Sequence, residues 1–258
     1  MSTIHPTAIV SPKAKIGNNI SIGPYSIIHD DVEIGDDCII GPHAVLYDGA
    51  RIGNRVKLSQ GVSVSNAPQD LKYNNEKTYF YIDDDTTVRE FVVLHRGTSS
   101  HGESKVGKNC LLMAYVHIAH DCYVGNNVII ANTCQIAGHC EIEDNVIIGG
   151  VTGVHQFSKI GKHAIVGACS KIASDVPPYI MASGHPARYY GLNLIGLKRR
   201  GFAKEEIETI RQVYKLFYES GLNHTQALAR INQEFASNKI AEGILEFLKK
   251  ATRGTVRK

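Results

Sequence analysis

Aliphatic residues recur every six positions over the first two thirds of the chain. Stepping by six from Ile4 to Ile172, Ile, Leu or Val occupies 26 of the 29 positions. The exceptions are Asp70, Glu76 and Ser100, and chance does not produce such a pattern. A fixed repeat of this kind predicts one structural unit that is stacked many times.

The position two residues before each aliphatic residue is also restricted, mostly to Ala, Val, Ser and Cys. Because residues two apart on a strand share a face, each unit has a short strand with two inward side chains. Gly follows the aliphatic residue ten times, as at Gly17, Gly125 and Gly161, and we attribute this to backbone strain at a tight corner. Five of the six cysteines occupy the small inward position, where we expect core residues rather than zinc ligands or disulfides: Cys38, Cys110, Cys122, Cys134 and Cys140.

A six-residue period with these corners resembles the hexapeptide-repeat parallel β-helix. In that family three units form one triangular coil, and the coiling is left-handed. Residues 4–176 would form about nine to ten coils. Two interruptions keep the phase of the repeat, and we expect them to be excursions from the prism wall at residues 65–81 and 99–105. Loops on a rigid scaffold commonly carry binding residues.

The C-terminal part of the chain has a different period. Apolar residues at helical spacing occur around Ile207, Ala227 and Ile240. The sequence therefore predicts a mainly β protein, with a left-handed parallel β-helix over residues 1–190 and a small α-helical domain over residues 191–258.

Charge is divided unevenly between these parts. Residues 1–180 hold 14 Lys+Arg and 18 Asp+Glu, a balance of −4, whereas residues 181–258 hold 14 and 7, a balance of +7. A basic tail on a mildly acidic body suggests that the tail meets an anionic partner. No apolar run approaches the roughly 18 residues of a membrane span, and the start of the chain lacks the features of a signal peptide. We therefore expect no membrane span and a cytoplasmic location.

Residues three units apart lie above one another in such a prism. His120 then lies under Gly138 and Asp121 under His139, all in corner positions between strands. His117 points outward between two inward residues. Such a patch suits either zinc, bound by neutral imidazoles, or a general base that a neighbouring carboxylate orients.

Several motifs occur in a fixed order along the chain: "QDLKY", "HIAHDC", "AGH", "GVHQF", "DVPPY" and "GLKRRGF". Together they resemble the UDP-N-acetylglucosamine O-acyltransferase family over nearly the whole chain. The resemblance implies a cytoplasmic homotrimer that starts lipid A biosynthesis. Such an enzyme moves a 3-hydroxyacyl chain from acyl carrier protein to the glucosamine 3-hydroxyl of UDP-N-acetylglucosamine. The acidic carrier would account for the basic tail, and no nucleic acid, cofactor or metal is implied.

The resemblance also implies roles for individual residues. His120 would be the general base, Asp121 would orient it, and the Gly138 N–H would bind the oxyanion. His139 matches a supporting position, and so do His117 and His155. The positions that match substrate contacts are Gln69, Asp70, Lys72, Gln156, Asn193, Arg199 and Arg200. The site would lie between neighbouring subunits, so that the trimer is required for activity.

Three positions depart from relatives. Ala168 lies where family members measure acyl length and a relative has glycine, which suggests a modestly shorter acyl chain. His185 and Pro186 stand where relatives often have Asn-His, and Ile195 replaces an acidic nucleotide contact.

Other functions stay open at this point. A related acyltransferase would use a 3-amino UDP-sugar and form an amide, and the later N-acyltransferase of the same pathway carries an extra N-terminal domain. A zinc-dependent γ-type carbonic anhydrase would hold zinc between subunits, but its ligand spacing differs from that of His117 and His120. A non-catalytic β-helix would have repetitive outward residues, which this chain lacks.

Overall fold

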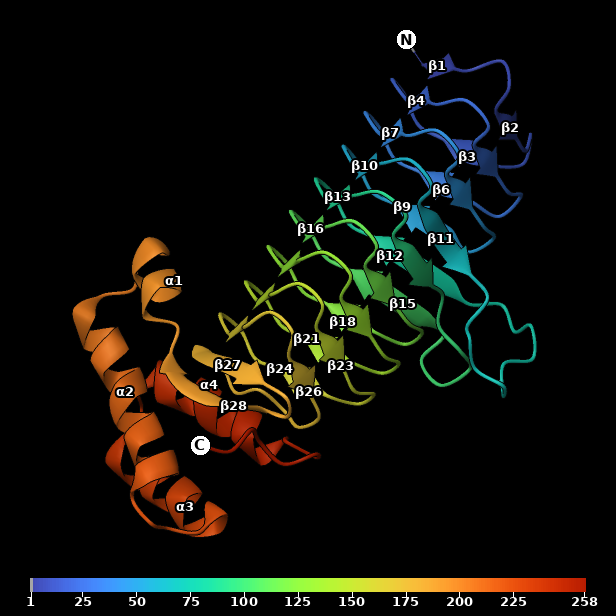
Figure 1. The fold of residues 1–258 in the computed structure, drawn as a ribbon. Helices are drawn as coiled ribbons and strands as arrows, with labels where there is room; N and C mark the ends of the chain where they lie inside the picture. The colour runs from blue at the N-terminus through green and yellow to red at the C-terminus, as the bar shows by residue number, and fades with distance from the viewer. Residues whose placement is uncertain (1) are drawn as a thin grey trace.

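The structure, a computed structural model, describes residues 2–258. Short strands stack into three sheets that form the walls of a prism (Figure 1). Sheet A contains, in spatial order, β1 (Thr3–Ile4), β4 (Ser21–Ile22), β7 (Ile39–Ile40), β10 (Lys57–Leu58), β13 (Thr87–Val88), β16 (Leu111–Leu112), β19 (Ile129–Ile130), β22 (Ile147–Ile148), β25 (Ile165–Val166), β27 (Ile180–Gly184) and β28 (Ala187–Leu192). Sheet B contains β2 (Ile9–Val10), β5 (Ile27–Ile28), β8 (Val45–Leu46), β11 (Ser63–Asn66), β14 (Val93–His95), β17 (His117–Ile118), β20 (Gln135–Ile136), β23 (Gly153–Val154) and β26 (Lys171–Ile172). Sheet C contains β3 (Lys15–Ile16), β6 (Glu33–Ile34), β9 (Ala50–Ile52), β12 (Tyr79–Ile82), β15 (Glu103–Val106), β18 (Tyr123–Val124), β21 (Glu141–Ile142) and β24 (Lys159–Ile160).

The six-residue repeat produces this architecture directly. Successive strands pass from sheet A to B to C, and each pairs in parallel with the strand one coil later, as Ile118 does with Ile136. From Ile22 onward the aliphatic residue of each unit points into the prism and is buried, and Ile118 and Leu112 have no exposed surface. At the open N-terminal end Ile4 is still 47% exposed because no coil lies beyond it. The predicted left-handed parallel β-helix is confirmed.

The cysteines are core residues, as predicted. Five are buried and free, and only Cys169 among the described residues is an exposed cysteine. Their thiols face carbonyl groups of the next coil: Cys122 Sγ lies 3.1 Å from the oxygen of Ala137, and Cys134 Sγ lies 3.1 Å from that of Gly149. A small thiol thus fills the inward position and uses a carbonyl of the coil above it.

The reason for the frequent glycines is different from the one predicted. Left-handed φ values occur three residues after the aliphatic residue, for example 56° at Asn19 and 57° at Asp121, whereas Gly17 has no such value. A Cβ at Gly17 would lie 2.8 Å from the carbonyl carbon of Gly35 in the next coil. Gly is therefore needed where the coils approach closely, and the corner strain falls two residues later.

Three edges join the sheets, and we name each by the sheets it connects: A–B, B–C and C–A. Both excursions leave the prism at the B–C edge, the first loop between β11 and β12 (residues 67–78) and the second between β14 and β15 (residues 96–102). The two loops lie side by side, since the Ser99 N–H donates to Glu76 Oε1 over 3.0 Å and the Arg96 guanidinium lies over the Tyr73 ring (Figure 1). Both therefore cover the same edge of the prism.

Four helices close the C-terminal end of the prism: α1 (Leu194–Arg199), α2 (Lys204–Glu219), α3 (His224–Glu234) and α4 (Lys239–Lys249) (Figure 1). The buried Tyr214 hydroxyl donates to the carbonyl of Pro178 over 2.7 Å and so ties α2 to the last coil. The short helix α1 and the antiparallel β27–β28 hairpin were not predicted, because neither is long enough to express a period. Among residues 2–258, no helix is both long and apolar enough to cross a membrane.

Candidate active site

The B–C edge brings His120 and Gly138 into contact. His120 follows β17 and Gly138 follows β20, one coil later. A Cβ at Gly138 would lie only 2.7 Å from Cε1 and 2.8 Å from Nε2 of His120. The stacking that the repeat predicts is therefore present, and the imidazole takes the space that any larger side chain at Gly138 would occupy.

Asp121 lies beneath the second loop. It is 1% exposed and accepts hydrogen bonds from Thr98 N over 2.9 Å and from Thr98 Oγ1 over 2.7 Å. The sequence predicted a carboxylate outside the prism, and the carboxylate does point away from the core. It is nevertheless buried, because the loop that carries Thr98 folds over it.

Burial by itself raises the pKa of the Asp121 carboxyl. The hydrogen bonds from His120 and Thr98 outweigh burial and hold this pKa well below its ordinary value. Asp121 therefore remains ionised throughout the neutral range. A permanent negative charge at this place favours a proton on the nitrogen of His120 that faces it.

The carboxylate fixes the state of His120. His120 Nδ1 lies 2.8 Å from Asp121 Oδ2, so Nδ1 donates to the carboxylate, and in the neutral imidazole the lone pair is on Nε2. The imidazole is 13% exposed, and Nε2 lies 4.0 Å from Asp70 Oδ2 of the first loop. That separation is too long for a direct hydrogen bond. His120 Nε2 is thus an available proton acceptor beside a second carboxylate.

The Gly138 N–H is a donor without an acceptor among residues 2–258. At the matching corner of the C–A edge, the Asn126 N–H donates to Asp144 Oδ1 over 2.6 Å. Gly138 packs against the His120 imidazole, so the unpaired donor and the proton acceptor belong to residues in contact. An unpaired backbone donor there suits an oxygen that gains negative charge.

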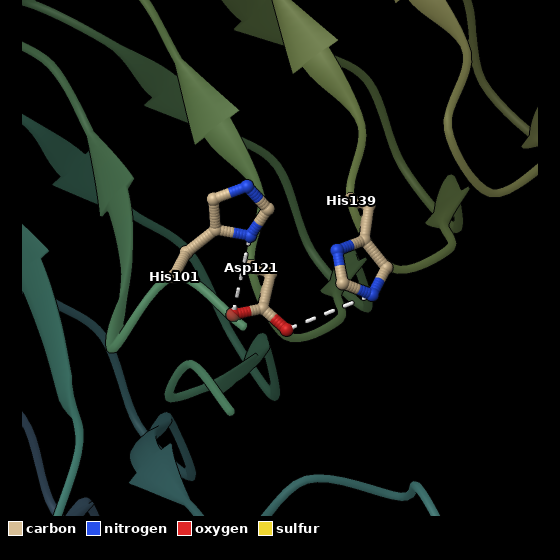
Figure 2. Close-up of side chains that lie close together, drawn as sticks. All are labelled: His101, Asp121 and His139. Atoms are coloured by element: carbon tan, nitrogen blue, oxygen red, sulfur yellow. Dashed lines mark ion pairs between the residues drawn. The ribbon is translucent and has the colours of Figure 1, made fainter. Parts of the chain in front are cut away.

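Two further histidines surround the carboxylate of Asp121 (Figure 2). His101 Nδ1 lies 3.6 Å from Asp121 Oδ1, and His139 Nε2 lies 3.7 Å from Asp121 Oδ2. Burial lowers the pKa of His139, although the charge of Asp121 opposes this. The sequence predicted His139 here but missed His101, which lies in the second loop and outside the repeat. The only sign in the sequence that His101 could lie near His120 was that this excursion begins one coil before His120.

His117, which is half-buried, forms a ring pair with the buried His95. Their ring centroids are 5.0 Å apart, and burial lowers both pKa values, that of His95 to about 4. His95 was not predicted, although it directly follows Leu94 of the repeat on the same edge. His155 lies one coil beyond Gly138, is exposed, and has Nδ1 3.1 Å from the oxygen of Gln156. The two predicted histidines, His117 and His155, thus lie near the B–C edge but make no hydrogen bond with the His120–Asp121 pair.

The first loop presents its predicted residues unevenly. Asp70 faces His120, and Asp70 Oδ1 also accepts a hydrogen bond from Lys72 N over 2.9 Å. The side chains of Gln69 and Lys72 are exposed. Gln156 is exposed as well and lies on the B–C edge two coils beyond His120.

Other predicted residues lie on different edges of the same chain. Asn193 caps α1 and donates from Nδ2 to the carbonyl of His163 over 2.9 Å. The Arg200 guanidinium binds the side chain of Asn145 on the C–A edge, and Arg199 is exposed. Ala168 is exposed at the A–B edge. None of these is brought to His120 within one chain.

A shallow groove of about 340 Å³ runs over the outer face of sheet B beside this edge. Its lining includes His117, Ala137, Val154 and His155. Ala137 directly precedes Gly138, so the groove begins next to the unpaired N–H. The edge thus combines an oriented base, a free donor and a groove that apolar residues help to line.

These features define a class of transferase, and comparison with family models agrees. The bacterial transferase hexapeptide model matches residues 13–47, 31–66 and 103–138. The model of the second domain of UDP N-acetylglucosamine O-acyltransferase matches residues 175–256. The first match identifies a hexapeptide-repeat transferase, and the second specifies a particular branch.

Relatives cover the whole chain. A UDP-N-acetylglucosamine O-acyltransferase of Chlorobaculum parvum is 58% identical over 98% of this chain and 97% of its own, and one of Thiobacillus denitrificans is 45% identical over the full length of both. The crystal structure of a UDP-N-acetylglucosamine acyltransferase from Bacteroides fragilis is 40% identical, with a TM-score of 0.97 over 99% of this chain and 100% of that one. A structure from Acinetobacter baumannii is 42% identical, with a TM-score of 0.95 over 98% and 99%. The chain belongs to the UDP-N-acetylglucosamine O-acyltransferase family.

Proposed function

We propose that this protein transfers a 3-hydroxyacyl chain from acyl carrier protein to the glucosamine 3-hydroxyl of UDP-N-acetylglucosamine, the first step of lipid A biosynthesis. One observation carries the chemical part of the proposal. His120 Nδ1 is hydrogen-bonded to the ionised Asp121, and the imidazole packs against Gly138, whose N–H has no acceptor among residues 2–258. A base and an oxyanion donor are the two groups that acyl transfer to a hydroxyl needs.

The reaction follows from these positions. His120 Nε2 takes the proton of the sugar hydroxyl while its oxygen attacks the carbonyl carbon of the thioester. Asp121 stabilises the imidazolium that forms, and the Gly138 N–H donates to the oxyanion, a contact worth about 3 kcal/mol of barrier. The intermediate then collapses, the carbon–sulfur bond breaks, and the imidazolium returns its proton to the departing thiolate. The products are the ester and the free carrier thiol.

Asp70 is positioned to hold the sugar. Its Oδ2 lies 4.0 Å from His120 Nε2, a gap into which a sugar hydroxyl fits with hydrogen bonds to both groups. Gln69, Lys72 and Gln156 are exposed around this point and supply further polar contacts, with Lys72 facing phosphate. His139, His117 and His155 support the site from their own coils.

The remaining predicted contacts require a homotrimer. Asn193, Arg199 and Arg200 lie near the C–A edge, away from His120 of the same chain. In our proposal a neighbouring subunit brings its own copies of these residues to the nucleotide or carrier end of the ligand. Because the site is then completed between subunits, dilution to monomer should abolish transfer.

In our proposal the chain consists of a catalytic β-helix at residues 1–190 and a carrier-binding helical unit at residues 191–258. The basic residues of the second unit would bind the acidic carrier, so carrier affinity should fall as salt rises. Unchanged affinity between low and high salt would argue against this contact. The six free cysteines fit a reducing compartment such as the cytoplasm.

The decisive test is transfer from a panel of 3-hydroxyacyl carrier proteins to UDP-N-acetylglucosamine. We expect an ester product that hydroxylamine cleaves. We also expect a preference for acyl chains shorter than the longest in the panel, because Ala168 adds a methyl group at the position where family members measure acyl length. Faster transfer to a 3-amino UDP-sugar, with a hydroxylamine-resistant amide, would identify the alternative acceptor. No transfer to either sugar would refute the function.

A further inference from the structure

We propose that His101, Asp121 and His139 form a binding site for a divalent transition-metal ion of the zinc type, which inhibits the enzyme. Figure 2 shows the two imidazoles pointing at the two oxygens of the carboxylate between them. The ion is a regulatory ligand in this proposal and takes no part in the transfer reaction.

The distances fit ligands that share one ion. One nitrogen of each histidine and one oxygen of Asp121 lie within 4.8 Å of one another. The two nitrogen–oxygen distances are 3.6 Å for His101 and 3.7 Å for His139, longer than hydrogen bonds. Two ligands about 2.1 Å from a tetrahedral ion lie about 3.4 Å apart. A small movement of the loop that carries His101, with small rotations of the Asp121 and His139 side chains, is enough to bring all three atoms to that spacing.

The scaffold holds two of the three ligands in place. Asp121 and His139 occupy the left-handed corner positions of successive coils, and the His139 N–H donates to the carbonyl of His120 over 3.0 Å. The His139 ring also stacks on Phe157 at 4.5 Å. His139 Nδ1 is buried without a partner among residues 2–258, and Nε2 has only the long contact with Asp121. A fixed ring whose nitrogens make no hydrogen bond has an atom to offer to an ion.

The third ligand provides access and selectivity. The His101 side chain is 44% exposed on the second loop, so an ion can reach the site from solvent. Two imidazoles and one carboxylate suit Zn²⁺ and its neighbours, whereas Mg²⁺ and Ca²⁺ prefer oxygen ligands. The site should therefore discriminate between these two groups of ions.

Binding would act on the base directly. Asp121 Oδ2 lies both 3.7 Å from His139 Nε2 and 2.8 Å from His120 Nδ1. An ion on Asp121 neutralises the charge that stabilises the His120 imidazolium. Inhibition of transfer follows. Only this inhibition rests on the proposed function, and binding of the ion does not.

The experiment compares metal-free wild-type protein with His101→Gln, because His101 touches no reacting group. Calorimetric titration with Zn²⁺ should give one tight site per chain in the wild type, and His101→Gln should weaken it at least tenfold. Co²⁺ should give the visible absorption of a low-coordinate site only in proteins that keep His101. His43→Gln, a histidine on the A–B edge, is the matched control and should bind like the wild type.

Transfer is measured in parallel. Both variants should have wild-type activity without metal, and His101→Gln should need at least tenfold more Zn²⁺ for half inhibition, with no effect of Mg²⁺ on any protein. Equal Zn²⁺ affinity of the wild type and His101→Gln, or no Zn²⁺ binding, would overturn the site. Weakened binding in the variant without any transfer activity in any protein would support the site and refute the function.

Discussion

The C–A and B–C edges of the prism have the same coil geometry but use it differently. At the C–A edge, side-chain oxygens of one coil accept hydrogen bonds from backbone N–H groups of the preceding coil. The pairs are Asn18 to Asp36 (2.6 Å), Asp36 to Asn54 (2.9 Å), Asn54 to Asp84 (2.8 Å), Lys108 to Asn126 (2.9 Å) and Asn126 to Asp144 (2.6 Å). Each of these five corners is therefore satisfied by the coil that follows it, and the Asn54 amide between Asp36 and Asp84 limits charge repulsion.

The B–C edge has such a pair at Asp31, whose N–H donates to Asp48 Oδ1 over 2.7 Å, but it leaves the corresponding N–H at Gly138 unpaired. Gly138 has no side chain, its N–H has no acceptor among residues 2–258, and His120 fills the vacant space. The carboxylate of Asp121 accepts hydrogen bonds from Thr98 of the second loop and from His120, not from a corner N–H group of a neighbouring coil. The same repeat can therefore be structural or reactive, depending on whether the polar groups at its corner are satisfied by the adjacent coil.

The largest difference between the edges should come from adding one methyl group to a glycine. Gly138→Ala would place Cβ 2.7 Å from the His120 ring and displace it, so kcat should fall about 10²- to 10³-fold with little change in Tm. Gly125→Ala on the C–A edge would place Cβ 2.8 Å from the Asp144 nitrogen. This control should lower Tm and leave kcat near wild type. Equal effects on kcat would remove the distinction between the edges.

Asp121→Asn should lower kcat about 10- to 100-fold, because the amide cannot stabilise the His120 imidazolium as the carboxylate does. Asp144→Asn on the C–A edge keeps an acceptor for Asn126 and should leave kcat unchanged. Steady-state assays of both variants make the comparison. A wild-type rate for Asp121→Asn would show that orientation of the base is unimportant.

Asp121→Asn should also alter the acid side of stability. The pKa of Asp121 is lowered by folding, so its contribution is present above its ordinary pKa near 4 and is lost as the pH falls below that value. The unfolding free energy of the variant should therefore fall less steeply between pH 5 and 3. Parallel curves for the two proteins would contradict this.

His163 on the C–A edge allows the effect of histidine burial on stability to be measured away from the candidate active site. Burial, with smaller effects of Arg200 and Lys162, lowers its pKa from 6.5 to about 4. Only the unfolded chain takes up a proton between these values, so stability is complete above pH 6.5 and falls toward pH 4. His163→Phe keeps the stacking on Tyr179 and should reduce this fall by about 2 kcal/mol. Denaturant titrations at pH 7.5, 5.5 and 4.5 measure the unfolding free energy of both proteins. The same pH dependence in His163→Phe and the wild type would contradict a lowered pKa of His163.

The smallest effect is expected for a single corner of the C–A edge. Asn126→Ala removes one acceptor, that for Lys108 N, and should cost about 1 kcal/mol of unfolding free energy. Transfer activity should stay at the wild-type level. A clear loss of kcat would mean that the C–A edge also contributes to the reaction.

Much of the site could be predicted because a residue and its neighbour one coil later have a fixed sequence offset. That offset alone brings Gly138 to His120 and His139 to Asp121. The loops carry no repeat, so nothing in the pattern indicates how they fold over the edge. Thr98, which buries Asp121, and His101, which faces it, were missed for that reason. The role of the glycines after the aliphatic residues was predicted wrongly. Their positions in the sequence do not distinguish strain at a corner from the close approach of a second coil.

The central claim is that His120 is the base of acyl transfer, and its most direct test is kcat of His120→Ala with UDP-N-acetylglucosamine and a 3-hydroxyacyl carrier protein. Loss of a positioned base should lower kcat about 10²- to 10⁴-fold while Tm stays near that of the wild type. The buried Asp121 keeps its two hydrogen bonds from Thr98 in this variant, so the second loop should remain in place. A correctly folded His120→Ala protein that transfers the acyl chain at nearly the wild-type rate would contradict the account.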